Sequence, residues 1–254
     1  MFPEAETWEN DLLTSAVDGI GWVIKTKQAA FLPLFESKLF PLVSPVLGQG
    51  TLGSLRSFGL CMCIDIVEHC GEGGQGVIPT LLPALLQASK QAGYRRKAHT
   101  HGQACAYGLG AVAEHGGDAF NAEASRSVAL LARLIQDRVR HAQRYDPKIY
   151  TDMQTRMADR DPEDSDKEAV FDNAVSALLK LMIFRGPAIE AGGGSLLSCL
   201  PLKRDMTEAH DCHRRVVDLA LDLDPLVVGV PGAGGGPGST VGALVAAIAG
   251  MMGK

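Results

Sequence analysis

The sequence predicts an all-α protein made of repeated helix pairs, and three observations lead to that fold class. Aromatic residues make up only 6% of the 254 residues, and Ala, Leu and Gly fill the apolar positions, a bias that suits stacked helices better than sheets. An apolar, helix-sized stretch at 103–117 has a similar copy 46 residues earlier, at 59–71. Residues 173–187 carry a third, weaker copy at an offset of 69.

The stretch 103–117 has small side chains on several faces, so neighbouring helices can approach it closely. Gly108 and Gly110 would each cost a helix about 1 kcal/mol relative to alanine, and close packing has to offset that cost. Both main copies end in Glu-His followed by glycine, and a His at a helix C-terminus interacts favourably with the helix dipole. Because HEAT and armadillo repeats have a period of about 40–47 residues, we expect a HEAT-repeat α-solenoid with about five antiparallel helix pairs.

The first pair is expected at 7–25 and 29–47. Its first helix carries apolar residues at helical spacing between Leu12 and Ile24. In its second helix Pro33 falls in the first turns, where proline is tolerated, whereas Pro41 and Pro45 imply a kink or an early end.

The next two pairs contain the repeated stretch. Their helices are expected at 52–69, 77–91, 95–115 and 120–138. A glycine-rich turn at 71–76 joins the helices of the second pair. These elements complete a first region, 1–138, that holds pairs 1 to 3.

Residues 139–167 show no apolar periodicity and hold a basic half followed by an acidic half, so we expect a solvated loop. The acidic half, Asp159 to Asp166, offers charge complementarity to a basic partner, with a plain solvated linker as the alternative. Helical periodicity resumes in a last region, 168–254, which is expected to hold pairs 4 and 5 and a Gly-rich loop at 229–238. Its helices are expected at 168–184, 195–200, 206–223 and 239–252.

Composition and charge exclude several classes of function. The net charge is −5 and no basic stripe is present, so nucleic acid is not expected as a partner, whereas a mildly acidic surface suits basic proteins. The N-terminus lacks a basic region followed by an apolar core, so no signal peptide is expected. The uncharged run 226–253 is rich in Gly and Pro in its first half and too short in its second to span a bilayer, so we expect a packed terminal helix and no membrane span.

The six cysteines mostly lie on apolar helical faces and form no compact framework. We therefore expect reduced, buried thiols in a protein of the cytoplasm or nucleus. The cysteines are Cys61, Cys63, Cys70, Cys105, Cys199 and Cys212.

Several motifs with possible chemistry favour structural interpretations. The glycine-rich loop 229–238 lacks the lysine of a phosphate-binding P-loop, so an inter-helix linker is favoured and no cofactor is expected. His210 and His213 share one helix face, but a structural zinc site needs four ligands and no second cluster lies at zinc-finger spacing. His99 and His101 are expected to be solvated residues on the opening turn of a helix.

Candidate nucleophiles are equally weak. Cys70 beside His69, and Ser176 or Ser198, would each need a base, an orienting group and an oxyanion site brought together. Nothing in a set of stacked helices points to that convergence. We therefore expect no catalytic, cofactor-binding or metal-binding residue, and not an enzyme.

Five sets of segments, in this order along the chain, resemble the C-terminal HEAT repeats of the importin-β (karyopherin-β) superfamily. They read FLPLFESKLFPLV, GLCMCIDIVEHC, ACAYGLG followed by GGDAF, DNAVSALLKLM, and LPLKRDMTEAH followed by DPLVVG. The resemblance covers nearly the whole chain apart from 139–167. The chain matches only a C-terminal part of the much longer family members, and Cys199 stands where the family commonly has tryptophan before Leu-Pro-Leu.

The resemblance implies a non-catalytic nuclear transport receptor of the cytoplasm and nucleus. Its partners would be protein cargo with basic signals, nucleoporins and the GTPase Ran. The repeats that make the main Ran and cargo contacts in the family have no counterpart in this chain, so no individual contact residue is carried over. A general HEAT-repeat interaction scaffold, or a regulatory subunit without a transport role, remains the alternative.

Overall fold

The computed structural model describes residues 3–48, 53–91, 99–144, 162–186 and 196–228. Every regular element in these ranges is a helix, so the all-α prediction is confirmed for the described part of the chain.

The helices, in chain order, are α1 (Pro3–Lys27), η1 (Gln28–Phe31), α2 (Leu32–Leu34), η2 (Phe35–Leu39), α3 (Phe40–Val46), α4 (Gly53–His69), η3 (Gly71–Val77), α5 (Ile78–Gln91), α6 (His99–His115), η4 (Gly117–Glu123), α7 (Ala124–Arg144), α9 (Pro162–Arg185), α11 (Met206–Leu221) and α12 (Pro225–Val228).

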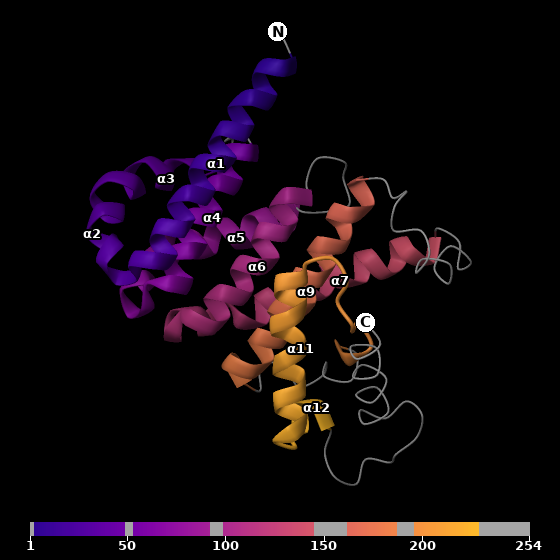
Figure 1. Cartoon of the computed structure of the whole chain (residues 1–254). Coiled ribbons are helices and arrows are strands. Elements are labelled where there is room, and N and C mark those ends of the chain that lie inside the picture. The colour runs from indigo at the N-terminus through magenta and orange to yellow at the C-terminus, as the bar shows by residue number, and fades with distance from the viewer. Residues whose placement is uncertain (1–2, 49–52, 92–98, 145–161, 187–195, 229–254) are drawn as a thin grey trace.

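The helices form two layers. In the first, which we call the main row, α1, α4, α6, α9 and α11 each pack against the next in chain order. In the second, α3 packs against α4, α5 against α4 and α6, and α7 against α5 and α9. The indigo N-terminal helices therefore lie at one end of the molecule, and α11 and α12, in yellow, lie at the other (Figure 1). The row follows the sequence because each helix contacts mainly its neighbours.

A residue with left-handed backbone follows every helix of the main row. These residues are Gln28 (φ 50°), Gly71 (59°), Gly117 (57°), Gly186 (59°) and Leu223 (55°), and they are all the residues with positive φ in the described ranges. A left-handed residue after a helix C-terminus reverses the chain and lets the last carbonyls find donors. The 46-residue offset read from the sequence separates Gly71 from Gly117, and the 69-residue offset separates Gly117 from Gly186. Both offsets read from the sequence therefore recur between the left-handed residues that follow α4, α6 and α9.

The second and third repeats match element by element. The helix α6 ends 46 positions after α4, and η4 begins and ends 46 positions after η3. A 3-10 turn starting at the left-handed glycine therefore leads into the second-layer helix in both repeats.

The helix α6 lies at the centre of the packing, as its small side chains predict. It contacts α4, α5 and α9, and most of its residues from Cys105 to Ala113 are buried. A Cβ on Gly108 would lie 2.7 Å from Ile64 and 2.8 Å from Leu85. The absence of a side chain at Gly108 therefore sets how closely two preceding helices approach.

The segment 28–46 is broken where one kinked helix was expected. It consists of a 3-10 turn, a short α segment, a π-helical turn at Phe35–Leu39 and α3. Pro41 has no N–H to bond the carbonyl four residues earlier and its ring crowds that carbonyl, so the chain widens before it. The sequence predicted a kink or an early end at Pro41 and Pro45, and the structure has a π-helical turn just before Pro41.

The expected loop at 139–167 is wrong at both ends. The helix α7 continues to Arg144, and α9 begins at Pro162. A high density of charged residues hides the apolar periodicity that marks a helix in a sequence, and a proline followed by acidic residues is a favourable helix start. Residues 145–161 lie outside the described ranges.

Two further predictions concern the last region. The short helix predicted at 195–200 is described only in its last part, where residues 196–197 are helical and residues 198–199 form a turn. The Gly-rich loop 229–238 and the helix predicted at 239–252 lie outside the described residues.

One stretch of the described chain, Asp11–Val46, is long and apolar enough to cross a membrane by length and composition alone. Only 17% of its most apolar 18-residue part is buried in the structure. The left-handed Gln28 and the π-helical turn both interrupt it. The run 226–253 considered from the sequence lies mostly outside the described residues.

Candidate functional site

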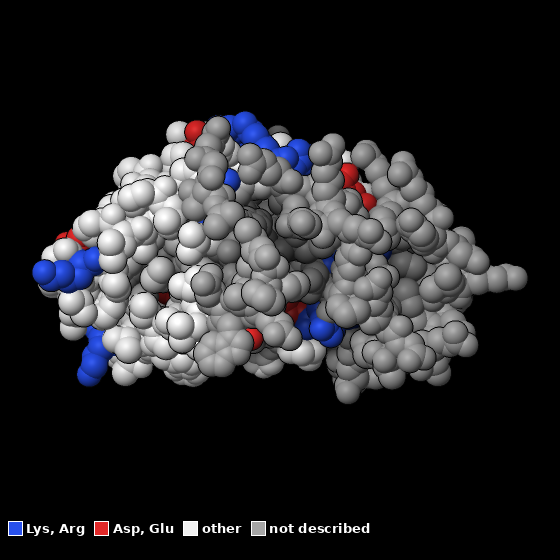
Figure 2. All heavy atoms as spheres, turned by 90° about the horizontal axis from the view of Figure 1, so that it is seen from above, with Lys and Arg blue, Asp and Glu red and all other residues white. Residues whose placement is uncertain are grey.

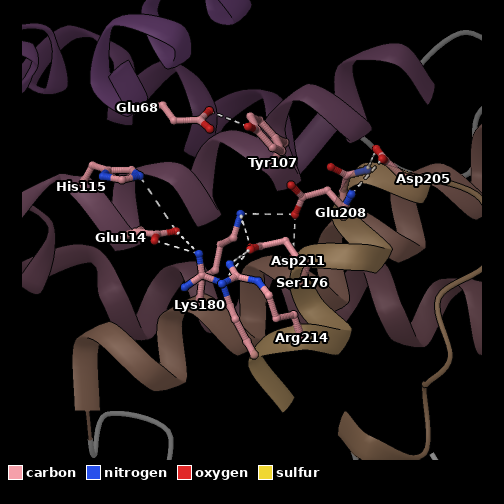
Figure 3. Close-up of polar contacts among 12 residues, drawn as sticks. Glu68, Tyr107, Glu114, His115, Ser176, Lys180, Asp205, Glu208, Asp211 and Arg214 are labelled. Atoms are coloured by element: carbon pink, nitrogen blue, oxygen red, sulfur yellow. Dashed lines mark hydrogen bonds and ion pairs between the residues drawn. The ribbon is translucent and has the colours of Figure 1, made fainter. Parts of the chain in front are cut away.

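A chain of polar contacts runs across the main row from α4 to α11, and we call it the polar seam (Figure 3). Its side chains come from four helices that lie far apart in the sequence. The members are Glu68, Tyr107, Glu114, Ser176, Lys180, Glu208, Asp211 and Arg215.

Lys180 of α9 is at the centre of the seam. Its side chain is 8% exposed, and its Nζ lies 3.3 Å from Glu208 Oε2 and 3.9 Å from Asp211 Oδ2. The same Nζ lies 5.4 Å from the centroid of the Tyr107 ring. Burying an ammonium group is costly unless it is paired, and here two carboxylates of α11 and one aromatic face of α6 surround it. Lys180 therefore holds three helices of the main row together.

The Glu208 carboxylate is shared between two partners on α9. Its side chain is 7% exposed, and Ser176 donates a 2.6 Å hydrogen bond from Oγ to the same Oε2 that contacts Lys180. Both partners are therefore fixed in one geometry. The arrangement leaves the Ser176 hydroxyl as a donor to a carboxylate and does not expose it as a nucleophile.

Tyr107 extends the seam from α6 to α4. Its hydroxyl donates to Glu68 Oε2 at 2.5 Å. Burial raises the pKa of the Tyr107 hydroxyl, and the neighbouring negative charge of Glu68 raises it further. The hydroxyl accordingly stays protonated and serves as a hydrogen-bond donor between the two helices.

Arg215 closes the other end of the seam. Its guanidinium donates from Nη2 to both carboxylate oxygens of Glu114, at 2.9 and 3.1 Å, and from Nε to Asp211 at 2.7 Å. Burial acts to raise the pKa of Asp211, but hydrogen bonds from Arg215 and Arg214 outweigh it, so the pKa lies below its ordinary value. Arg215 thus connects α11 directly to α6, the two helices that flank α9 in the main row.

The turn that leads into α11 is organised by two side chains of α9. Asp172, which is 1% exposed, accepts backbone N–H bonds from Lys203 and Asp205 at 3.0 Å each and from Arg204 at 2.5 Å. Asn173 donates to the Asp205 carboxylate at 2.9 Å. These contacts position Asp205 so that it caps α11.

Asp205 is the N-cap of α11 and connects it to two other helices. Its Oδ1 accepts from the Glu208 N–H at 3.2 Å, while Oδ2 accepts from Asn173 and, at 3.3 Å, from Gln103 of α6. The cap therefore sets the position of Glu208 relative to Lys180.

A second acidic group lies at the junction of α1 and α4. Burial raises the pKa of Asp65 to about 7, and the charges of Glu68 and Asp18 raise it as well. Asp18 is exposed on α1, and Asp65 and Glu68 are partly buried on α4. We call these three residues the acidic cluster.

The seam's chemistry is that of a structural connection. Its carboxylates, ammonium, guanidinium and hydroxyl groups form hydrogen bonds and ion pairs with one another between helices. The arrangement fixes the spacing and rotation of α6, α9 and α11, and so sets the surface that these helices present.

The residues singled out for metal binding do not come together. Among the described residues no group of three or more His, Cys, Asp or Glu side chains is placed to hold a metal ion. His213 accepts a 3.0 Å hydrogen bond from the Leu202 N–H, whereas His210 is exposed. The helix α6 begins at His99 and includes His101, but the side chains of both lie outside the described residues.

The candidate nucleophiles named from the sequence lie on different elements. His69 ends α4, and Cys70 is buried behind it; burial raises the pKa of the Cys70 thiol. Ser198 lies in the turn at 198–199. All six cysteines are free thiols, four of them buried as expected, while Cys61 and Cys199 are half-buried.

Sequence reasoning missed Lys180, Glu208 and Arg215. A signal for Lys180 was present, because a single lysine interrupts the apolar run from Ala177 to Ile183 and a buried lysine requires acidic partners. The identity of those partners could not be read from the sequence, since Glu208 is 28 positions away from Lys180 and Glu114 is 101 positions away from Arg215.

No known protein-family profile matches the chain.

Proposed function

We propose that this chain is a HEAT-type α-solenoid segment of an importin-β-type nuclear transport receptor. It would act as a non-catalytic scaffold that binds protein partners in the cytoplasm and the nucleus. The observation that carries the proposal is the succession of five main-row helices, each followed by a left-handed residue and each packed on the next. Stacked units that contact only their neighbours are the hallmark of solenoid proteins.

A second observation supports the resemblance to importin-β repeats. The segments DNAVSALLKLM and LPLKRDMTEAH, which carry part of the resemblance, meet in the polar seam and in the turn before α11. The first supplies Asp172, Ser176 and Lys180, and the second supplies Asp205 and Glu208. The resembling residues thus make a specific inter-repeat contact.

The proposed mechanism is geometric. A row of stacked helices offers an extended surface on which a partner is held by many spread-out contacts. The polar seam fixes the helices from α6 to α11, and the acidic cluster places negative charge near the α1–α4 junction, which suits a basic cargo signal. Elastic changes in curvature would couple the binding of one partner to the release of another.

A binding assay with Ran tests the transport role. The chain would be applied to immobilised Ran loaded with GTP or with GDP. Preferential retention on the GTP form is the expected result for a regulated transport receptor. Equal or absent retention on both would remove Ran regulation and leave the general interaction scaffold.

A peptide assay tests cargo binding independently. We expect a basic signal peptide to bind more tightly than a charge-neutral control, and binding to weaken with added salt. Asp18→Lys changes an exposed residue of the acidic cluster outside the seam and should weaken the basic peptide without affecting a Phe-Gly-rich pore peptide. If neither peptide binds, the transport role is wrong.

A further inference from the structure

One face of α1 carries an exposed apolar stripe. Leu12, Ala16, Gly19 and Val23 are all exposed and recur at intervals of four, three and four residues, which places them on one side of a helix. Leu12 is 66% exposed and Val23 43% exposed. Ile24, by contrast, is fully buried in the core, so α1 contacts the rest of the molecule through another face. We call the four exposed residues the α1 stripe.

The α1 stripe has the spacing of a coiled-coil seam, in which intervals of four and three residues alternate. Its positions are also symmetric about one point in the middle of the helix. Leu12 and Val23 lie equally far from that point, and so do Ala16 and Gly19. Two copies of α1 that pack antiparallel around this point therefore bring Leu12 against Val23 and Ala16 against Gly19, each pair twice.

The centre of the stripe is suited to close approach. The distance between two packed helices depends on the side chains at their contact, and here these are only a methyl group and a hydrogen atom. A Cβ on Gly19 would meet nothing within 4 Å in a single copy, whereas in the antiparallel pair it would meet Ala16 of the other copy. The larger side chains, Leu12 and Val23, then enclose this centre from both sides.

The charges of α1 favour the antiparallel arrangement. The helix has four acidic residues before Leu12 and two lysines after Val23. The acidic residues are Glu4, Glu6, Glu9 and Asp11, and the lysines are Lys25 and Lys27. Antiparallel pairing sets the acidic end of one copy beside the lysines of the other, whereas parallel pairing sets like charges side by side. The opposed helix dipoles favour the same orientation.

We propose that this chain forms a two-fold symmetric dimer through antiparallel pairing of the α1 stripes of two copies. The interface is isologous, because the same residues of both copies bury one another. The main rows of the two copies then extend away from a shared centre at α1. The dimer does not rest on the transport role of the proposed function.

The surface around α1 agrees with a second copy as the occupant. Figure 2 looks down on the molecule from the side at which α1 lies in Figure 1, and the described surface over the N-terminal helices is mostly uncharged, with charged side chains at its edge. Trp22, 69% exposed, lies beside the stripe on the same helix. An apolar centre with exposed aromatic residues and a charged rim is the usual composition of a protein–protein interface.

Sedimentation velocity of the whole chain over a range of concentrations tests the dimer. We expect the sedimentation coefficient to rise with concentration towards that of two copies. Val23→Asp sets a charge against Leu12 across the interface and should weaken association by about tenfold or more. Leu42→Asp, which changes a leucine that is 70% exposed on α3, is the matched control and should leave association unchanged. Circular dichroism confirms that both variants keep their helix content.

A cross-linking experiment tests the orientation. Leu12→Cys and Val23→Cys chains are mixed and oxidised, and linked peptides are identified by mass spectrometry so that links of the natural cysteines are recognised. The expected link joins position 12 of one copy to position 23 of the other, because a disulfide forms only where the two Cα atoms come within about 7 Å. Leu12→Cys alone should give no link between two copies of position 12.

Four results would overturn the proposal. The first is a monomer at every concentration up to the solubility limit, and the second is a dimer that Val23→Asp leaves intact. The third is a link between two copies of position 12, which would show parallel pairing. The fourth is flotation of a monomeric chain with phosphatidylcholine vesicles that Val23→Asp abolishes, which would assign the stripe to a membrane surface. Loss of Ran and peptide binding with an intact dimer would remove only the transport role.

Discussion

The two ends of the main row are joined by different side-chain chemistry on a similar backbone. At the C-terminal end, α6, α9 and α11 are connected by the buried Lys180, its two carboxylates and Arg215. At the N-terminal end, α4 and α6 meet through Ile64 against the missing side chain of Gly108, and the seam reaches this junction through the Tyr107–Glu68 hydrogen bond. The left-handed residue after each main-row helix marks where that helix ends. The side chains between neighbouring helices then determine which contacts join them.

The difference has consequences for rigidity and specificity. An apolar junction tolerates small sliding, whereas a buried ion pair is satisfied in one geometry and strongly penalises others. We therefore expect the ion-paired part of the seam around Lys180 and Arg215 to be the stiff part of the molecule, and the α1–α4–α6 junctions to be the compliant part. The predictions below test this comparison.

Lys180→Met should have the largest effect. It leaves the Glu208 carboxylate buried without its cation, and removing one partner of a buried pair costs about 3–5 kcal/mol of unfolding free energy. Urea denaturation measures the loss. The double variant Lys180→Met with Glu208→Leu should recover part of it, and a loss below about 1 kcal/mol in the single variant would show that the seam is not a stiff connection.

Gly108→Leu and Gly19→Leu form a matched pair, because each glycine lies nine residues before the left-handed residue that follows its helix, Gly117 or Gln28. The first forces a side chain between Ile64 and Leu85 and should cost about 3 kcal/mol. The second enters open space and should be neutral or stabilise α1 by up to about 1 kcal/mol, because leucine is a better helix former than glycine. Thermal unfolding compares them, and equal effects would show that the two positions are not equivalent.

The acidic cluster should make stability depend on pH. The pKa of Asp65 in the folded protein is about 7, above the value of about 3.9 expected in the unfolded chain. The folded state therefore binds the proton more tightly, so its contribution is fully present below about pH 4 and is lost as pH rises through about 7. Asp65→Asn should gain about 2 kcal/mol over the natural protein at pH 8 and little at pH 4, allowing for partial exposure of the group. Urea midpoints at both pH values measure this, and parallel pH profiles would contradict it.

Tyr107→Phe should have the smallest destabilising effect among the variants of the seam. It removes the hydrogen bond to Glu68 while keeping the ring beside Lys180, and should cost about 1 kcal/mol. Urea denaturation again provides the measurement. A loss as large as that of Lys180→Met would place the main contribution of the seam at α4 and not at α9.

The repeat was readable from the sequence because its signals are local. Glycine after a Glu-His helix end recurs at a fixed offset, and α4 and α6 end 46 positions apart as that offset predicts. The same local logic failed for residues 139–144 and 162–167, which are rich in charge but belong to α7 and α9. Arg138 of α7 and Glu168 of α9, which flank the predicted loop, form an ion pair that connects the two helices.

The seam was not readable because its partners are separated by long stretches of chain. Lys180 stood out as a charge in an apolar run, yet several carboxylates could have neutralised it. Only the packing of α9 against α11 selects Glu208 and Asp211. The left-handed Gln28 and Leu223 were missed for a similar reason, since neither residue type prefers that conformation.

Those two residues carry a consequence for how the protein melts. At the three central turns glycine adopts positive φ freely, while Gln28 and Leu223 each pay about 1 kcal/mol for it, and both belong to the outermost units of the row. In a stack whose units contact mainly their neighbours, the weakest links give way first. Within the described row, heating should therefore open α1 first and α11 once the seam gives way, with α6 the last helix to lose its neighbours.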